Sequence, residues 1–69
     1  MIWFFERETE RLQCEIRRAA DTDAIELVVT GPNGPVSQQF DDPRQVLERS
    51  QVVWHNLFER GWRPLQPRP

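Results

Sequence analysis

Polar and apolar residues alternate along much of the first 40 positions of the chain, and this spacing predicts β-strands. Residues 11–17 alternate without a fault, with Leu12, Cys14 and Ile16 on one face and polar side chains on the other. A period of two is typical of a strand that buries one face. Residues 2–7, which are rich in aromatic side chains, are predicted to form a strand before it.

The short segment 8–10 joins these two strands as a hairpin, and the length of the turn decides which aromatic side chains are buried. A two-residue turn puts Trp3 and Phe5 on the apolar face of the second strand. A three-residue turn puts Ile2 and Phe4 there instead, because a slip of one residue exchanges the faces. Two-residue hairpin loops are the commoner kind, so the sequence favours Trp3 and Phe5 inside and leaves the other register open.

Two further strands are predicted on either side of Gly31-Pro32-Asn33-Gly34, the clearest turn signal in the chain. Proline presets the first central position of such a turn, and Asn and Gly tolerate positive φ. Closing the turn pairs residues 24–30 with residues 36–40 and matches their apolar faces, since Val29 then lies opposite Val36. The strand at 36–40 is polar, so it is expected at an edge of the sheet.

A helix is predicted to follow. Asp42 is a good N-cap and Pro43 suits the first helical position. Apolar residues then recur at helical spacing and form one stripe that is expected to lie on the sheet. The stripe consists of Val46, Leu47, Ser50, Val53, Trp54, Leu57 and Phe58. Gly61 is suited to end the helix, and Trp62 is expected to fold back on its last turn.

The predicted fold class is therefore α+β, with a four-stranded antiparallel meander followed by one C-terminal α-helix that packs on one face of the sheet. Residues 1–63 are expected to form a single domain. Residues 64–69 contain three prolines, cannot continue the helix, and are expected to form a solvated tail. The tail has a Pro-x-x-Pro spacing at 64–67, which is common by chance and is interpreted here as part of a solvated terminus.

This order of four strands and a helix resembles the repeat unit of the Pur-alpha and Whirly single-strand-binding proteins. The resemblance covers most of the chain in topology, rests on no motif and carries over no residue. It implies an open sheet face that binds single-stranded nucleic acid. Those sheets are characteristically basic, whereas this chain has nine arginines, no lysine, eleven acidic residues and a net charge of −2. Nucleic-acid binding is therefore kept as the alternative, disfavoured by net charge.

Few side chains in the sequence are suited to catalysis or to holding a metal ion. Cys14 is the only cysteine and lies in mid-strand on the apolar face, where a buried, inert thiol is expected. His55 is the only histidine and falls on the solvent side of the helix, beside Glu59. Asp21 and Asp23 have a calcium-like spacing but lack the glycine and glutamate that follow in a calcium-binding loop. We therefore expect no enzyme, no cofactor and no metal site.

One face of the sheet stays open after a single helix has packed on the other. Its candidate interface residues are Ile2, Phe4, Arg17 and Val28. A small non-enzymatic interaction protein that forms a homodimer is the expected function, with the protein partner unknown. The apolar start at 2–5 is too short for a secretory signal or a membrane span, and the single cysteine favours a cytoplasmic location.

Overall fold

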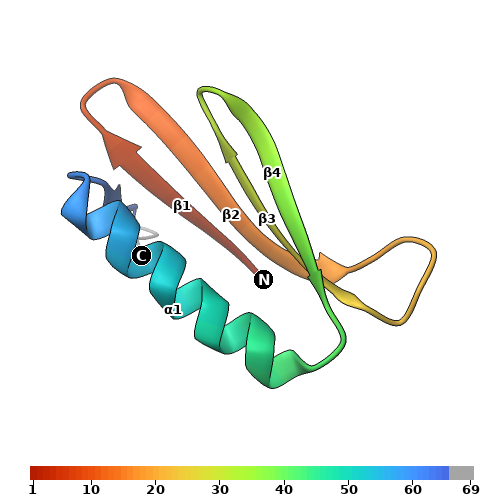
Figure 1. Ribbon diagram of the computed structural model, residues 1–69. Helices are drawn as coiled ribbons and strands as arrows, with labels where there is room; N and C mark the ends of the chain where they lie inside the picture. The colour runs from red at the N-terminus through yellow and green to blue at the C-terminus, as the bar shows by residue number, and fades with distance from the viewer. Residues whose placement is uncertain (66–69) are drawn as a thin grey trace, which may run out of the picture.

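The structure is a computed structural model that describes residues 1–65 and contains one antiparallel sheet and one helix (Figure 1). Its elements are β1 (Ile2–Arg7), β2 (Glu10–Arg18), β3 (Ile25–Gly31), β4 (Gly34–Phe40), α1 (Pro43–Glu59) and the short β5 (Arg63–Pro64). The order across the sheet is β4-β3-β2-β1-β5. This confirms the predicted α+β fold, in which a four-stranded meander is followed by a helix packed on the sheet. The fifth strand was not predicted.

The first hairpin adopts the register that the sequence favoured. The two-residue turn between β1 and β2 places Glu8 at a φ of 55°, in the left-handed region that tight hairpin turns use. Trp3 and Phe5 lie opposite apolar residues of β2, and Phe5 is buried. Ile2 and Phe4 point to the other face of the sheet, where they are 50% and 49% exposed.

The second hairpin also has the predicted pairing. Val29 lies opposite Val36, and the ladder continues to Gly31 opposite Gly34, so only two residues form the turn. Gly34 has a φ of 98°, a conformation that glycine adopts without strain. The strand β4 lies at the edge of the sheet, as expected for its polar sequence. As an edge strand it is largely exposed, Val36 included.

The helix begins and ends at the predicted residues. The carboxylate of Asp42 accepts a hydrogen bond from the backbone N–H of Arg44 at 2.9 Å, and Pro43 occupies the first turn. At the other end Gly61 has a φ of 92°, and the N–H of Trp62 donates to the carbonyl of Leu57 at 2.9 Å. This turn folds Trp62 back into the core, where it is buried.

The apolar stripe of α1 is narrower than predicted. Val46, Ser50 and Leu57 are buried, but Leu47 is 53% exposed and Phe58 is 43% exposed. The expectation that these two residues lie on the sheet is therefore wrong. Leu47 and Phe58 share one flank of the helix because they are eleven residues, or about three turns, apart. Phe58 lies at the β1 edge of the sheet, where a helix flank has little sheet beneath it.

The core lies between the sheet and α1. Its buried members are Phe5, Leu12, Cys14, Leu27, Leu57 and Trp62. Trp3 and Trp54 pack against this cluster at the β1 side, with ring centroids 5.0 Å apart and ring planes at 78°. Edge-to-face packing of this kind is a preferred arrangement for aromatic pairs.

The segment after the helix returns to the sheet. β5 pairs with Phe5 and Glu6 of β1, and the N–H of Leu65 donates to the carbonyl of Phe4 at 2.8 Å. The first two residues of the predicted tail thus lie along β1, whereas residues 66–69, with the second half of the Pro-x-x-Pro spacing, lie outside the described residues. No helix in the described part of the chain is long and apolar enough to cross a membrane.

Candidate functional site

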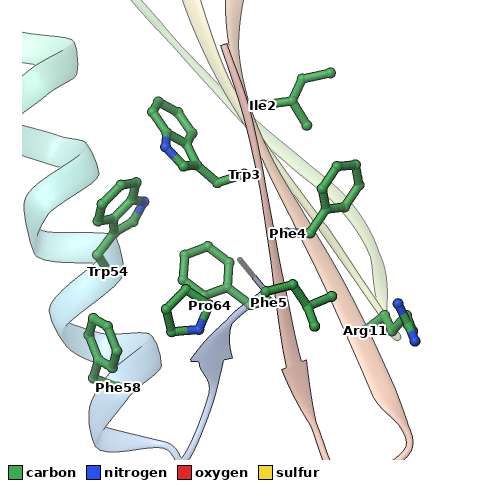
Figure 2. Close-up of a pocket in the computed structure, with 9 residues that line it drawn as sticks. Ile2, Trp3, Phe4, Phe5, Arg11, Trp54, Phe58 and Pro64 are labelled. Carbon is green, nitrogen blue, oxygen red and sulfur yellow. The ribbon is translucent and has the colours of Figure 1, made fainter. Parts of the chain in front are cut away.

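A groove of about 800 Å³ lies at the edge of the sheet, where β1 faces α1 and the end of the described chain (Figure 2). We call it the aromatic groove. On the helix side it is lined by Trp3, Phe5, Trp54, Phe58 and Pro64. Its other lining residues are Ile2, Phe4, Arg11 and Leu65. The groove is therefore apolar along most of its length, and among residues 1–65 Arg11 is its only charged lining residue.

The register of β1 explains why the groove draws on both faces of the strand. Successive side chains of a strand point to opposite faces, so Trp3 and Phe5 point to the helix while Ile2 and Phe4 point away from it. Figure 2 shows the two sets of side chains on either side of the β1 ribbon. Within the described residues, β5 covers β1 only along Phe5 and Glu6. The N-terminal half of β1 is thus left at the edge with its apolar side chains exposed.

Aromatic contacts hold the helix side of the groove in place. Trp54 packs edge-to-face on Trp3 and also on Phe5, whose ring centroid is 5.9 Å away. Phe58, one turn further along α1, lies under the guanidinium of Arg63 at 5.9 Å. Arg63 also donates to the carbonyl oxygens of Trp62 and Phe58, so its charge is engaged at the end of the helix.

Arg11 is placed differently from Arg7 and Arg17, two other arginines of the β1–β2 hairpin. It lies on the outer face of β2, opposite Glu6, and forms no ion pair with any residue among 1–65. In contrast, Arg7 binds the carboxylate of Glu10 at 2.9 Å and stacks on the ring of Trp62 at 4.6 Å. The guanidinium of Arg11 is therefore available to a molecule in the groove.

The structure brings together two of the four predicted interface residues. Ile2 and Phe4 lie side by side on the outer face of β1 and both line the groove. Val28 lies on β3, two strands away, and is only 8% exposed. Arg17 lies on the outer face of β2, two residues beyond Glu15, which is opposite Ile2, but it does not line the groove and pairs with the carboxylates of Glu15 and Glu26. The exposed apolar surface of the sheet is therefore centred on β1 and does not extend to Val28.

The arginines of the hairpin do not form an uninterrupted basic surface. Arg17 contacts Glu26 at 3.1 Å and Glu15 at 3.5 Å, and Glu15 lies directly opposite Ile2. Arg7 is paired with Glu10, as described above. Acidic residues thus intervene on the same strands, and a phosphate backbone would meet both signs of charge there. This distribution favours a protein or small-molecule ligand over nucleic acid.

The buried thiol of Cys14 lies beneath the groove, in the core. Burial raises the pKa of this thiol, and the nearby indole N–H of Trp54 offsets part of that rise. The indole nitrogen of Trp54 is itself buried and makes no hydrogen bond of standard geometry with residues 1–65. A fully covered thiol with a raised pKa is neutral at pH 7 and is a poor nucleophile.

His55 lies on the exposed side of α1, where its Nε2 is 2.9 Å from the carboxylate of Glu59. No hydrogen bond in residues 1–65 joins it to a nucleophile. In the same part of the chain no three His, Cys, Asp or Glu side chains come together as a metal site. Within residues 1–65, neither His55 nor Cys14 therefore forms an acid–base or nucleophile–base pair.

Seven of the nine residues that line the groove were not identified as site residues from the sequence. Trp3 and Phe5 were expected in the core, and Arg11 was not singled out. Trp54 and Phe58 have helical spacing that places them in the apolar stripe, and spacing does not reveal which part of a stripe overhangs the sheet. Pro64 and Leu65 belong to a segment without periodicity, and their position depends on the turn at Gly61.

Comparison with protein-family models, with curated proteins and with solved structures found no match.

Proposed function

We propose that this protein is a small non-enzymatic interaction protein that forms a homodimer through the outer face of β1 and the adjoining rim of the aromatic groove. One observation carries the proposal. Ile2, Phe4 and Phe58 are 50%, 49% and 43% exposed, and all three border the same groove. Isolated exposed apolar side chains are common, whereas several around one depression are typical of an interaction site.

The position of this surface at a sheet edge supports self-association. Met1 exchanges two hydrogen bonds with Ile16 of β2, at 3.0 and 2.9 Å. Because backbone groups of alternate residues point to opposite sides of a strand, those of Ile2 point away from β2. Within residues 1–65, β5 ends before it reaches Ile2. Such an edge is a template for a further strand, and its apolar flanks add area to the contact.

The small size of the protein gives a second reason. A domain of about 60 residues buries only about 60% of the surface that its unfolded chain exposes, so its core is marginal. A second copy would cover the exposed rings and enlarge the core. Twofold dimers are the commonest assemblies and place the same patch on both partners. A specific interface of standard size needs about 800 Å² from each partner.

A matched pair of variants tests the location of the interface. Phe4→Glu places a carboxylate in the proposed contact, whereas Val36→Glu places one at the opposite edge of the sheet, on β4. We expect Phe4→Glu to raise the dimer dissociation constant at least 100-fold and Val36→Glu to leave it within threefold. Analytical ultracentrifugation measures both constants. Loss of dimer in Val36→Glu alone would assign the interface to β4 and contradict the proposal.

A cytoplasmic location is part of the same proposal, supported by the single cysteine of the chain, which is buried.

The alternative function, single-stranded nucleic-acid binding on the outer face, has the support of Phe4 as a stacking ring with Arg11 nearby. The ion pairs of Arg7 and Arg17 count against it. Fluorescence anisotropy with a labelled oligothymidylate measures this activity, and we expect no saturable binding at physiological salt.

A further inference from the structure

We infer that the aromatic groove binds a small amphipathic carboxylate, a molecule with an apolar body and one carboxylate group that is recognised by Arg11. This inference goes beyond the proposed dimer and does not depend on it. It rests on three features of the groove: its volume, its lining and the one charge beside it. Each of them bears on a different property of the ligand.

The volume and the lining define the body of the ligand. Sites for small molecules commonly measure about 300–1,000 Å³ and are mostly apolar, with a few polar groups that orient the ligand. The aromatic groove has a volume of about 800 Å³. On the helix side its wall is formed by Phe58 and by Trp3 and Trp54, whose rings are in contact, and on the other side of β1 it is bordered by Ile2 and Phe4. An alkyl chain or a flat ring that lies against this wall would contact aromatic surfaces from both β1 and α1.

The charge beside the groove defines the head group. In the part of the chain that the structure describes, Arg11 is the only charged residue in the lining, and no carboxylate there pairs with it. A guanidinium presents a planar fork of donors that matches a carboxylate, and such charge-assisted bonds are stronger than neutral ones. A cationic head group would meet Arg11 itself. The groove is therefore complementary to an anion, although the chain as a whole has a net charge of −2.

The ligand and a second copy of the chain would share part of one surface, because Ile2 and Phe4 belong to both proposals. The binding experiment is therefore performed at a protein concentration at which sedimentation shows a monomer. If the protein is monomeric at every concentration, the proposed function fails while the ligand experiment is unaffected. If the dimer forms but no ligand binds, the present inference fails alone.

The three tryptophans of the chain provide the assay. Trp3 and Trp54 line the groove, whereas Trp62 is buried beneath Arg7, outside it. Each indole N–H gives its own signal in a ¹H–¹⁵N correlation spectrum. Titration of labelled protein with octanoate is expected to move the signals of Trp3 and Trp54 in a saturable way and to leave that of Trp62 in place. Octanol and octyltrimethylammonium serve as the uncharged and cationic probes.

The charge variants complete the test. Octanoate is expected to bind at least tenfold more tightly than either probe, since a hydrogen bond to a charged group contributes about 1.5–3 kcal/mol. Arg11→Gln should abolish this preference. Arg18→Gln, which removes the same charge from an exposed position of β2 outside the groove, should preserve it. Equal affinity for the three probes, an unaltered preference in Arg11→Gln, or the absence of saturable shifts at Trp3 and Trp54 would each overturn the inference.

Discussion

Trp54 joins α1 to the aromatic side of the sheet, so its replacement tests the packing of the helix on β1. Its ring packs edge-to-face on Trp3 and on Phe5, with centroid distances of 5.0 and 5.9 Å. The side chain is half-buried, because part of it lines the aromatic groove. Trp54→Ala removes both ring contacts and leaves Trp3 without its partner on the helix.

The expected cost follows from these contacts. Truncation of a fully buried Trp to Ala typically costs about 3–5 kcal/mol. For a half-buried ring, the part of this cost that comes from removing apolar surface from water should be roughly half as large. Each aromatic pair adds about 0.5–1.5 kcal/mol. The variant also removes a buried indole N–H that lacks a hydrogen bond. Burying such a group lowers the free energy of unfolding of the native protein by about 1 kcal/mol, so its removal offsets part of the loss. We therefore expect Trp54→Ala to lower the free energy of unfolding by about 2–3 kcal/mol.

Urea unfolding followed by circular dichroism measures this loss. For a domain of this size the slope is about 1 kcal/mol per molar urea, so the midpoint should fall by about 2–3 M. Val52→Ala is the matched control, because Val52 is exposed on the other side of α1 and should cost less than about 0.5 kcal/mol. Trp54→Phe keeps a ring and removes the N–H, and it should cost less than about 1 kcal/mol. Equal losses in Trp54→Ala and Val52→Ala would refute the orientation assigned to the helix.

Three further predictions concern single residues. Burial raises the pKa of Cys14, so the neutral thiol stabilises the fold below the unfolded pKa of about 8.5, and this contribution is lost as pH rises through the folded pKa. The chain has no lysine or tyrosine. The free energy of unfolding should therefore fall as the pH rises above about 8.5 in the native protein and stay level in Cys14→Ala. An equal fall in both would disprove this assignment. His55→Ala should change the free energy of unfolding by less than about 0.5 kcal/mol, as expected for an exposed i,i+4 pair. Any hydrolase or transferase activity of the purified protein should survive this substitution. Loss of such activity with folding intact would contradict a purely structural His55. Gly61→Ala should cost about 1–2 kcal/mol in urea unfolding, because Gly61 has a φ of 92°, and an unchanged midpoint would show that this cap is dispensable.

The strand pairing could be predicted because short-range signals determine it. The two-residue turn sets the register of β1 against β2, and the turn at 31–34 sets that of β3 against β4. In each hairpin the alternation on both strands agrees with the pairing. A slip of one residue would expose Phe5, which is almost fully buried, so the hydrophobic pattern and the turn give the same answer.

Some residues were placed wrongly from the sequence or were not identified. Their burial depends on how far the neighbouring sheet and side chains extend, which the local sequence pattern does not give. Helical spacing gives the direction in which Leu47 and Phe58 point, but it does not give the width of the sheet beneath them. Alternation puts Val28 on the outer face, yet it does not show that neighbouring side chains cover it. β5 spans only Arg63–Pro64 and has no periodicity, so it could not be recognised before the return of the chain at Gly61 was known.

The aromatic groove could be predicted only in part for the same reason. The part contributed by Ile2 and Phe4 of β1 follows from the register of the first hairpin. The other part comes from α1 and from Pro64 and Leu65, which lie about 50–60 positions further along the chain. Contacts at such separations depend on how the helix packs and where its last turn sends the chain. Arg11 became a candidate only when its neighbours proved not to neutralise it.

Sedimentation equilibrium of the unmodified protein over a concentration series from 1 to about 100 µM tests the central claim most directly, because interfaces of standard size give dissociation constants from micromolar downwards. The chain has a mass of 8.2 kDa. The proposed homodimer predicts that the weight-average mass rises with concentration toward twice this value. A mass that stays at 8.2 kDa throughout the series would contradict the homodimer and leave the exposed rings of β1 to a different partner.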